Sequence, residues 1–403
     1  MDPAPDDNHW PAFFRQKLVK NAHFWLARLQ DAGQDDRLLH RERQNIASAL
    51  TWALQLEDAW RPGLELALAF HPYAERQGSW YDWEQSLQAS LSVSRQQENR
   101  VAEAALLRAL GELKRYQGDW PAAATYQESA CRLYAGLGDG RGEAGALANL
   151  GDVYRLQGKL DEARKALERA LCTYQACGDL EDQAFVHNNL GLVHRDQRDW
   201  DRALEHHQAA WRLWSDAGSL EGMARARHNI GVSHRLKGDL VQAEACLQEA
   251  VALYGQTNSI VYQAVASMDL GNVCLNQGRV EQAEGLYRRA IEIMGDTGYS
   301  LGLAQASNNL GLALMEQRKW NEAEDSFQRS IQVWRRLGQP VGRACAEDNL
   351  ADLYLRQEKW EAAREILVDA RQRLARSAMG GRAAAQLADI EAHLKMAEAG
   401  LAG

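Results

Sequence analysis

The feature that most constrains this chain is an apolar residue followed by glycine, repeated at intervals of forty residues. Six copies keep this pair, and in a seventh the glycine is replaced by alanine. The apolar members are Leu110, Leu150, Leu190, Ile230, Leu270, Leu310 and Leu350. A constant period of this length is typical of an array in which one small unit stacks on copies of itself, so the repeat predicts the architecture before any local pattern is considered.

Each forty-residue unit has the pattern of two helices joined by a short turn. Apolar residues recur at spacings of three and four, as one face of a helix requires. In the third copy the pattern predicts helices over residues 181–196 and 200–217. Glycine follows the second helix where a left-handed C-terminal cap belongs. These predicted caps are Gly138, Gly178, Gly218, Gly298 and Gly338. The expected fold class is all-α.

The glycine of the repeated pair lies inside the first predicted helix, where it is unfavourable. A glycine there costs about 1 kcal/mol relative to alanine, so six copies lose roughly 6 kcal/mol. Close packing is the simplest compensation for that loss. In the third copy Ala203 and Trp200 follow Gly191 on the second helix. We expect the glycine and the alanine to let the two helices approach, while the large apolar residue covers the joint.

These units resemble the tetratricopeptide repeat family. The family pattern is matched by NLGDVYRLQGKLDEA (149–163) and NLADLYLRQEKWEAA (349–363), with Tyr154 and Tyr354 at the tyrosine position. Other copies depart there, with Lys114, His194, His234, Cys274 or Leu314. The forty-residue form resembles a longer-helixed subgroup found in cell-polarity adaptors, kinesin-light-chain-like scaffolds and the sensors of signalling ATPases. The resemblance implies seven repeats over residues 98–380, wound into a right-handed α-solenoid superhelix.

Residues before the array do not keep its period. We expect an N-terminal helix and linker over 1–38 and atypical helical repeats over 39–97. A run of five residues resembles the junction at which STAND signal-transduction ATPases lead into their repeat sensor. These residues are Asn45, Ala49, Leu50, Trp52 and Ala53. No GxxxxGK[ST] phosphate loop occurs in the sequence, so the resemblance implies the sensor without its nucleotide-binding module, with an ATPase module in the same parent protein as a partner.

The end of the chain and its composition complete the expected organisation. Residues 381–403 have the pattern of one final helix that covers the last apolar face of the array. A net charge of -9 argues against a general affinity for nucleic acid or for acidic membrane surfaces. The six cysteines form no CxxC pair and are expected to be reduced, buried and structural. With no secretion signal and no long apolar stretch, we expect a soluble cytoplasmic protein.

The residues just before the repeated apolar residues form a polar column. In the tetratricopeptide repeat family the first helix of each unit lines a concave groove, so the resemblance implies that this column stacks along the groove. It comprises Ala109, Asn149, Asn189, Asn229, Asp269, Asn309 and Asn349. Asparagine both donates and accepts hydrogen bonds, which suits the backbone of an extended peptide. The alternative is that these amides only bridge neighbouring first helices or satisfy a carbonyl within a turn.

A second column lies five residues after the repeated apolar residues. Its first four members are arginines, and the last three are Leu275, Met315 and Leu355. The arginines are Arg115, Arg155, Arg195 and Arg235. Helical spacing places them beside the asparagines, where they could grip a carboxylate or phosphate of a ligand. Alternatively, they pair with acidic residues of the array such as Asp152 or Glu112.

Histidines gather in the middle of the array, and a metal site or a pH switch is one interpretation of them. They are His187, His194, His206, His207, His228 and His234. We favour packing with satisfied rings, because His194 and His234 occupy the tyrosine position of the pattern. No metal and no cofactor is therefore expected.

The sequence favours a binding protein over an enzyme. It contains no nucleophile elbow, no HExxH and no phosphate loop. We expect a non-catalytic sensor that recognises a protein, a peptide or a small-molecule inducer in its groove. The alternative is a freestanding adaptor that binds a partner peptide.

Overall fold

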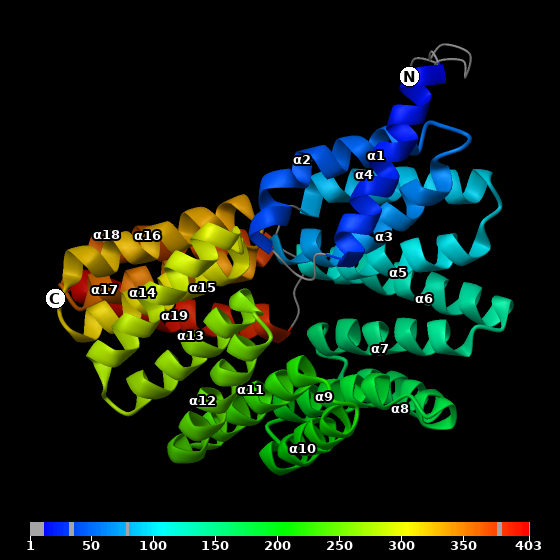
Figure 1. The fold of residues 1–403 in the computed structure, drawn as a ribbon. Coiled ribbons are helices and arrows are strands. Elements are labelled where there is room, and N and C mark those ends of the chain that lie inside the picture. The colour runs from blue at the N-terminus through cyan, green and yellow to red at the C-terminus, as the bar shows by residue number, and fades with distance from the viewer. Residues whose placement is uncertain (1–11, 32–35, 78–79, 377–380, 403) are drawn as a thin grey trace. The chain divides into compact units, whose positions relative to one another are not determined.

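The computed structural model describes residues 12–31, 36–77, 80–376 and 381–402, and all regular structure in these ranges is α-helical (Figure 1). The helices are α1 (Ala12–Asp31), α2 (Asp36–Ala53), α3 (Trp60–Gln77), α4 (Trp80–Gln96), α5 (Arg100–Gln117), α6 (Trp120–Leu137), α7 (Gly140–Leu156), α8 (Leu160–Cys177), α9 (Leu180–Asp196), α10 (Trp200–Asp216), α11 (Leu220–Lys237), α12 (Leu240–Gln256), α13 (Ile260–Asn276), α14 (Val280–Thr297), α15 (Ser300–Glu316), α16 (Trp320–Arg336), α17 (Pro340–Leu355), α18 (Trp360–Arg376) and α19 (Gly381–Ala402). The predicted all-α fold is confirmed.

From α5 onward the helices alternate as the first and second helices of seven repeats, from α5–α6 to α17–α18. In the third repeat, α9 and α10 match the predicted helices to within one residue at each end. The chain divides into two compact units, Met1–Leu150 and Gly151–Gly403, and the division falls within α7. Within the second unit each helix from α8 to α18 packs on the next one along the chain.

The turns between helices follow a period of twenty residues, half that of the repeat. Every helix from α4 to α17 is followed by one residue with a positive φ angle. The five predicted glycine caps are among them, with φ near 70° at Gly178, for example. Five positions carry other residues, namely Glu98, Arg198, Asn258, Arg318 and Glu358. A side chain in this conformation costs about 1–2 kcal/mol, so at these five positions the packing of the flanking helices imposes the turn.

The glycine of the repeated pair makes room for a side chain of the second helix. A Cβ atom added to Gly191 would lie 2.5 Å from His207, and one added to Gly271 would lie 2.6 Å from Tyr287. The corresponding side chain is always sixteen residues beyond the glycine. The six are Gln127, Leu167, His207, Leu247, Tyr287 and Phe327. The predicted close approach is confirmed, but its main partner is this side chain rather than the alanine, whose carbonyl oxygen is among the nearest atoms only at Gly151 and Gly231.

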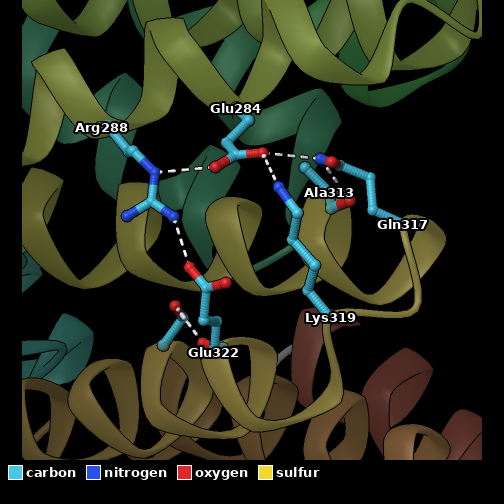
Figure 2. Close-up of polar contacts among 7 residues, drawn as sticks. Glu284, Arg288, Ala313, Gln317, Lys319 and Glu322 are labelled. Carbon is cyan, nitrogen blue, oxygen red and sulfur yellow. Dashed lines mark hydrogen bonds and ion pairs between the residues drawn. The ribbon is translucent and has the colours of Figure 1, made fainter.

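A glutamate on the second helix of several repeats holds the turn of the next repeat. Figure 2 shows the network around Glu284 of α14. Its carboxylate accepts hydrogen bonds from Arg288 (2.8 Å), Gln317 (2.7 Å) and Lys319 (3.0 Å), the last two lying at the end of α15 and in the following turn. Burial opposes ionisation of Glu284, yet these three donors hold its pKa down to about 2. Glu84 and Glu244 occupy the same position in the forty-residue period and make equivalent contacts.

The described segment before the array consists of the four helices α1 to α4. α1 packs on α2 and α3, and α4 packs on α5. On α2, Ala49, Leu50 and Ala53 are buried, whereas Trp52 is 38% exposed. Ala49, Leu50 and Ala53 share one buried helix face, as their spacing requires, whereas Asn45 and Trp52 of the same run are exposed. The assignment of this run to an ATPase junction stays a prediction, as does the four-part division of the chain.

The last helix packs on the final repeat. Ile390, Leu394 and Ala397 of α19 are buried against α17 and α18, where they join Leu367 and Leu374 in one apolar cluster. This is the arrangement expected of a helix that covers the end of an array.

The cysteines depart in part from expectation. No disulfide joins them, but only Cys246 and Cys274 are buried, while Cys172 and Cys177 are exposed on α8. The prediction of burial was wrong for these two because they lie on the solvent face of their helix. In the described ranges, no helix combines the length and the apolar character needed to cross a membrane.

Candidate ligand-binding wall

The first helices of the second unit approach one another more closely than the second helices do. α9 contacts α11, α11 contacts α13, α13 contacts α15, and α15 contacts α17. Consecutive second helices of the described repeats have no contact of comparable extent. The first helices therefore form the inner side of this unit. We call the surface of α9, α11, α13, α15 and α17 the inner wall.

The asparagine column runs along the first helices, and most of its amides bridge two of them. On the inner wall, Asn229 donates to Oδ1 of Asn188 (2.6 Å) and Asn309 donates to Oδ1 of Asn272 (3.0 Å). The amide of Asn349 donates in the same way to Asn308 (2.9 Å). In the first unit, Asn149 donates to Glu112 (2.6 Å), and Ala109 at the start of the column is buried.

These bridges satisfy only part of each amide. Asn229, Asn309 and Asn349 are half-buried, and each uses one donor in the bridge, which leaves a second N–H and the Oδ1 acceptor. Asn189 is 7% exposed and makes no side-chain hydrogen bond to any described residue. Bridging between first helices is thus observed, while contact with a ligand through the remaining groups stays a prediction.

Asp269 interrupts the asparagines with a carboxylate. It accepts hydrogen bonds from His228 (2.7 Å) and Asn272 (3.0 Å). Burial opposes its ionisation, but these donors and the nearby Arg235 lower the pKa of Asp269 below its ordinary value. Asp269 therefore carries a negative charge in the middle of the inner wall at neutral pH.

The arginine column is engaged by the protein itself over most of its length. The guanidinium of Arg155 lies between Asp152 (2.7 Å) and Asp196 (2.6 Å), and its side chain is only 8% exposed. Burial opposes its charge, but the two carboxylates raise the pKa of Arg155 above its ordinary value. Arg195 lies 3.9 Å from Asp196, and Arg115 stacks over the ring of Tyr116. The predicted alternative, pairing within the array, is therefore observed at Arg155.

Arg235 differs from the other three arginines. It is half-buried, its Nε has no hydrogen-bond partner, and no carboxylate of the described residues forms an ion pair with it. It lies near enough to Asp269 to lower the pKa of that carboxyl group. Arg235 is thus a cation of the inner wall that retains its donors.

Three histidine–carboxylate pairs also link neighbouring helices, and sequence reasoning missed them. They are His71–Glu112 (3.0 Å), His228–Asp269 (2.7 Å) and His393–Asp348 (2.7 Å). In the first two the partners are 41 residues apart, one more than the repeat period. A search for complementary side chains at this separation would have found both. Burial opposes ionisation of Glu112, but His71, Arg108 and Arg115 hold its pKa down to about 2.

The central histidines form a cluster in the third repeat. Nδ1 of His187 lies 3.0 Å from Nδ1 of His206, and the ring of His194 stacks on that of His206. His207 is completely buried, and neither of its ring nitrogens has a partner among the described residues. The prediction of satisfied rings was wrong for His207, because its ring fills the space beside Gly191 and meets no hydrogen-bonding partner among the described residues. No group of three or more metal-ligating side chains in the described ranges is arranged to hold a metal ion.

Comparison with known proteins identifies the family to which this chain belongs. Sequence models of the tetratricopeptide repeat match residues 182–256, 222–296 and 302–376, and a second form of the repeat matches 144–176. Together these segments cover more than half of the 403 residues. The chain belongs to the tetratricopeptide repeat family. No curated protein matches it in sequence.

Solved structures share the fold of this tetratricopeptide repeat protein at low sequence identity. A Rap protein complexed with Competence and Sporulation Factor is 15% identical, with a TM-score of 0.54, over 87% of this chain and 99% of the other. The apo quorum sensor NprR from B. thuringiensis is 14% identical, with a TM-score of 0.52, over 90% and 99%. A STAND protein with a tetratricopeptide repeat sensor from Pyrococcus horikoshii is 12% identical, with a TM-score of 0.53, over 84% and 52%. The chain thus spans about half of that STAND protein.

Proposed function

We propose that this protein is a non-catalytic ligand-binding domain whose inner wall recognises a protein or a peptide. The observation that carries the proposal is the row of half-buried amides on the first helices α11, α15 and α17, each with hydrogen-bonding capacity beyond its bridge. An extended peptide backbone offers alternating donors and acceptors that such a row can match. At about 0.5–1.5 kcal/mol for each net hydrogen bond, a few such contacts supply a substantial share of a micromolar affinity.

Of the four arginines in the column, Arg235 is the one that contacts the ligand in this proposal. Arg155 is held by two carboxylates of the protein, whereas Arg235 retains donors for a carboxylate or phosphate of the ligand. The carboxylate of Asp269, near Arg235, favours a positively charged donor group on the ligand. The preferred ligand therefore carries a negative group for Arg235 and a positive group for Asp269.

We further propose that the domain is the sensor of a STAND-type signalling ATPase and that ligand binding releases its ATPase module. Two observations support this role. The chain shares its fold with the STAND protein from Pyrococcus horikoshii over 84% of its length, and the run on α2 resembles the junction that precedes such sensors. A small-molecule inducer is a further ligand class compatible with this role. The alternative is a freestanding adaptor, in which the same wall holds a partner peptide without an attached module.

Peptide selection tests recognition by the inner wall. Random peptides displayed on phage are selected on the wild-type protein, and the best peptide is titrated by fluorescence polarisation. The double variant Asn189→Ala, Asn229→Ala should bind it about ten- to thirty-fold more weakly, because two amides are lost. Asn321→Ala, an exposed asparagine on the second helix α16, is the matched control and should bind normally. Unchanged affinity in a folded double variant would show that the wall is not the site.

A genomic comparison separates the sensor from the adaptor. A reading frame that encodes a nucleotide-binding module upstream of this chain supports the sensor. A frame that contains the repeats alone supports the adaptor.

A further inference from the structure

For their length, the two terminal helices of this protein expose more large apolar side chains than the helices between them. Twelve large apolar residues are well exposed in the described ranges, and five of them lie on α1 or α19. These five are Phe13, Phe14, Phe24, Met396 and Leu401. In a repeat array each unit buries its apolar face on its neighbour, and terminal helices normally present a polar outer face. Exposed apolar groups at both ends therefore indicate a surface for association.

The exposed side of α1 is aromatic and basic. Phe13, Lys17, Lys20, Phe24 and Arg28 follow one another at spacings of three or four residues, so they form one stripe along the helix. All five are exposed, while Ala22, Trp25 and Leu26 bury the opposite face. We call these five residues the α1 stripe.

The cations of the α1 stripe have no acidic partner in the described residues. The ammonium group of Lys17 lies 4.4 Å from the centre of the Phe13 ring, and Lys20 and Arg28 form no ion pair. This stripe is a local positive region on a protein with a net charge of -9. Its complement is an apolar surface flanked by carboxylates.

The exposed side of α19 has that chemistry. Ala388, Ala392, Met396 and Ala399 lie along one side of the helix and are exposed. Carboxylates flank them at Asp389, Glu391 and Glu398, and the exposed Lys395 lies among them, so this side of the helix carries a net charge of about -2. Small side chains let a neighbouring helix approach closely, and Met396 offers a flexible apolar contact for an aromatic ring. We call the four apolar residues and the three carboxylates the α19 face.

We propose that the α1 stripe of one copy packs on the α19 face of a second copy, so that chains associate head to tail. The contact is heterologous, because each copy contributes a different surface and leaves its other end free. Large aromatic rings meet small side chains, and the three cations of the α1 stripe meet a side of α19 on which three carboxylates outnumber the single cation Lys395. One such contact covers the α1 stripe of one copy and the α19 face of the other.

Sedimentation velocity of the full chain over a wide concentration range, at low and high salt, tests the proposal. The wild type should form species larger than the monomer, and salt should weaken them because charges contribute. Phe24→Glu on α1 and Met396→Glu on α19 should each raise the concentration needed for association about tenfold or more. Lys20→Glu, which changes an exposed and unpaired residue, should weaken association without affecting the fold. Val241→Glu alters a 76% exposed residue of α12 and should have no effect.

Mixing the variants distinguishes head-to-tail association from symmetric contacts. Phe24→Glu retains its α19 face and Met396→Glu retains its α1 stripe, so an equimolar mixture should form dimers that grow no further. A wild type that stays monomeric would overturn the proposal, as would a mixture that forms no dimers. Binding of a monomeric wild type to vesicles of anionic lipid, lost in Phe24→Glu, would assign the stripe to a membrane surface instead.

Discussion

The third and fifth repeats have the same backbone and the same helix-interior glycine, but they fill the joint between their helices differently. Gly191 faces His207 and Gly271 faces Tyr287, and both side chains are completely buried. The hydroxyl of Tyr287 donates a 2.7 Å hydrogen bond to Asn272, whereas the ring nitrogens of His207 have no partner in the described structure. The fifth repeat buries a satisfied polar group, and the third buries an unsatisfied one.

The two repeats also differ three residues earlier on the second helix. The fifth repeat has Glu284, which binds the turn of the sixth repeat, and the third has Leu204, which packs with Ile230 and Cys246. The glycine therefore specifies a space for a large side chain, while the chemistry of that side chain varies from repeat to repeat. Because each repeat contacts mainly its neighbours, such differences set the stability of the array locally.

Low pH should produce the largest difference in stability between the third and the fifth repeat. Burial, together with Arg195, His206 and His228 nearby, lowers the pKa of His207 from 6.5 to about 3. The unfolded chain therefore binds the proton more readily, so stability is lost as the pH falls below 6.5, at about 1.4 kcal/mol for each pH unit. Hydrogen exchange at falling pH should show α9 and α10 opening before α13 and α14.

The variant His207→Leu tests the cause of that acid sensitivity. Leu167 and Leu247 occupy the same position in neighbouring repeats, so leucine should fit beside Gly191. It should raise the free energy of unfolding by about 1–3 kcal/mol at neutral pH and reduce the acid sensitivity of α9 and α10. His23→Gln, at an exposed histidine of α1, should change neither quantity. Persistence of the full acid sensitivity in His207→Leu would assign it to the other histidines of the cluster.

The packing at the glycine of the fifth repeat is tested by two alanine substitutions. A Cβ at residue 271 would lie 2.6 Å from Tyr287, whereas one at residue 285 would meet no atom within 4 Å. Gly271→Ala should destabilise the protein by about 1–3 kcal/mol through overpacking. Gly285→Ala should stabilise it by up to about 1 kcal/mol, because alanine favours the helix. Equal effects in thermal or denaturant unfolding would show that the glycine is not needed for packing.

The link from the fifth to the sixth repeat is tested by Glu284→Gln. The substitution removes the charge that Arg288 and Lys319 share and should cost about 1–2 kcal/mol at neutral pH. The pKa of Glu284 is lowered from 4.5 to about 2 in the folded protein. The stabilisation that its charge provides is therefore present above pH 4.5 and is lost as the pH falls from 4.5 to about 2. Glu292→Gln, at an exposed residue of α14 with no ion pair in the described structure, is the control. An equal loss in both variants at pH 7 would contradict a specific role for Glu284.

The smallest effect is expected for Tyr287→Phe. Phenylalanine already fills the equivalent place in the sixth repeat at Phe327, so only the hydrogen bond to Asn272 is lost. The expected cost is about 1 kcal/mol in denaturant unfolding. A much larger cost would mean that the Tyr287 hydroxyl organises Asn272 and its bridge to Asn309.

The period of forty residues predicts the fold because it repeats every local signal seven times. Helix ends near Asp196 and Asp216 and the left-handed cap at Gly218 follow from capping and apolar spacing alone. The partner of the helix-interior glycine could not be predicted in this way, because its position holds six side chains of four chemical kinds. No residue type marks it in the sequence, and its identity emerges only once the two helices are packed.

The candidate site was predicted only in outline. The column of asparagines is visible in the sequence, but its bridges depend on which first-helix residues face each other across repeats. Asn229 reaches Asn188 at a separation of 41 residues, and Asn309 reaches Asn272 at 37. Neither separation equals the period, because the contacts run obliquely between helices. Likewise, the isolation of Arg235 and the engagement of Arg155 depend on acidic side chains whose proximity only the packed helices determine.

The turns that recur every twenty residues have a consequence for how such a chain can grow. Between Glu98 and Glu358, a segment of forty residues bounded by two of these turns begins and ends at equivalent backbone conformations, whichever turn is chosen. Duplication or excision of one segment therefore leaves the remaining helices in register and creates no new kind of junction. Recombination can therefore lengthen or shorten such an array by one forty-residue unit at a time.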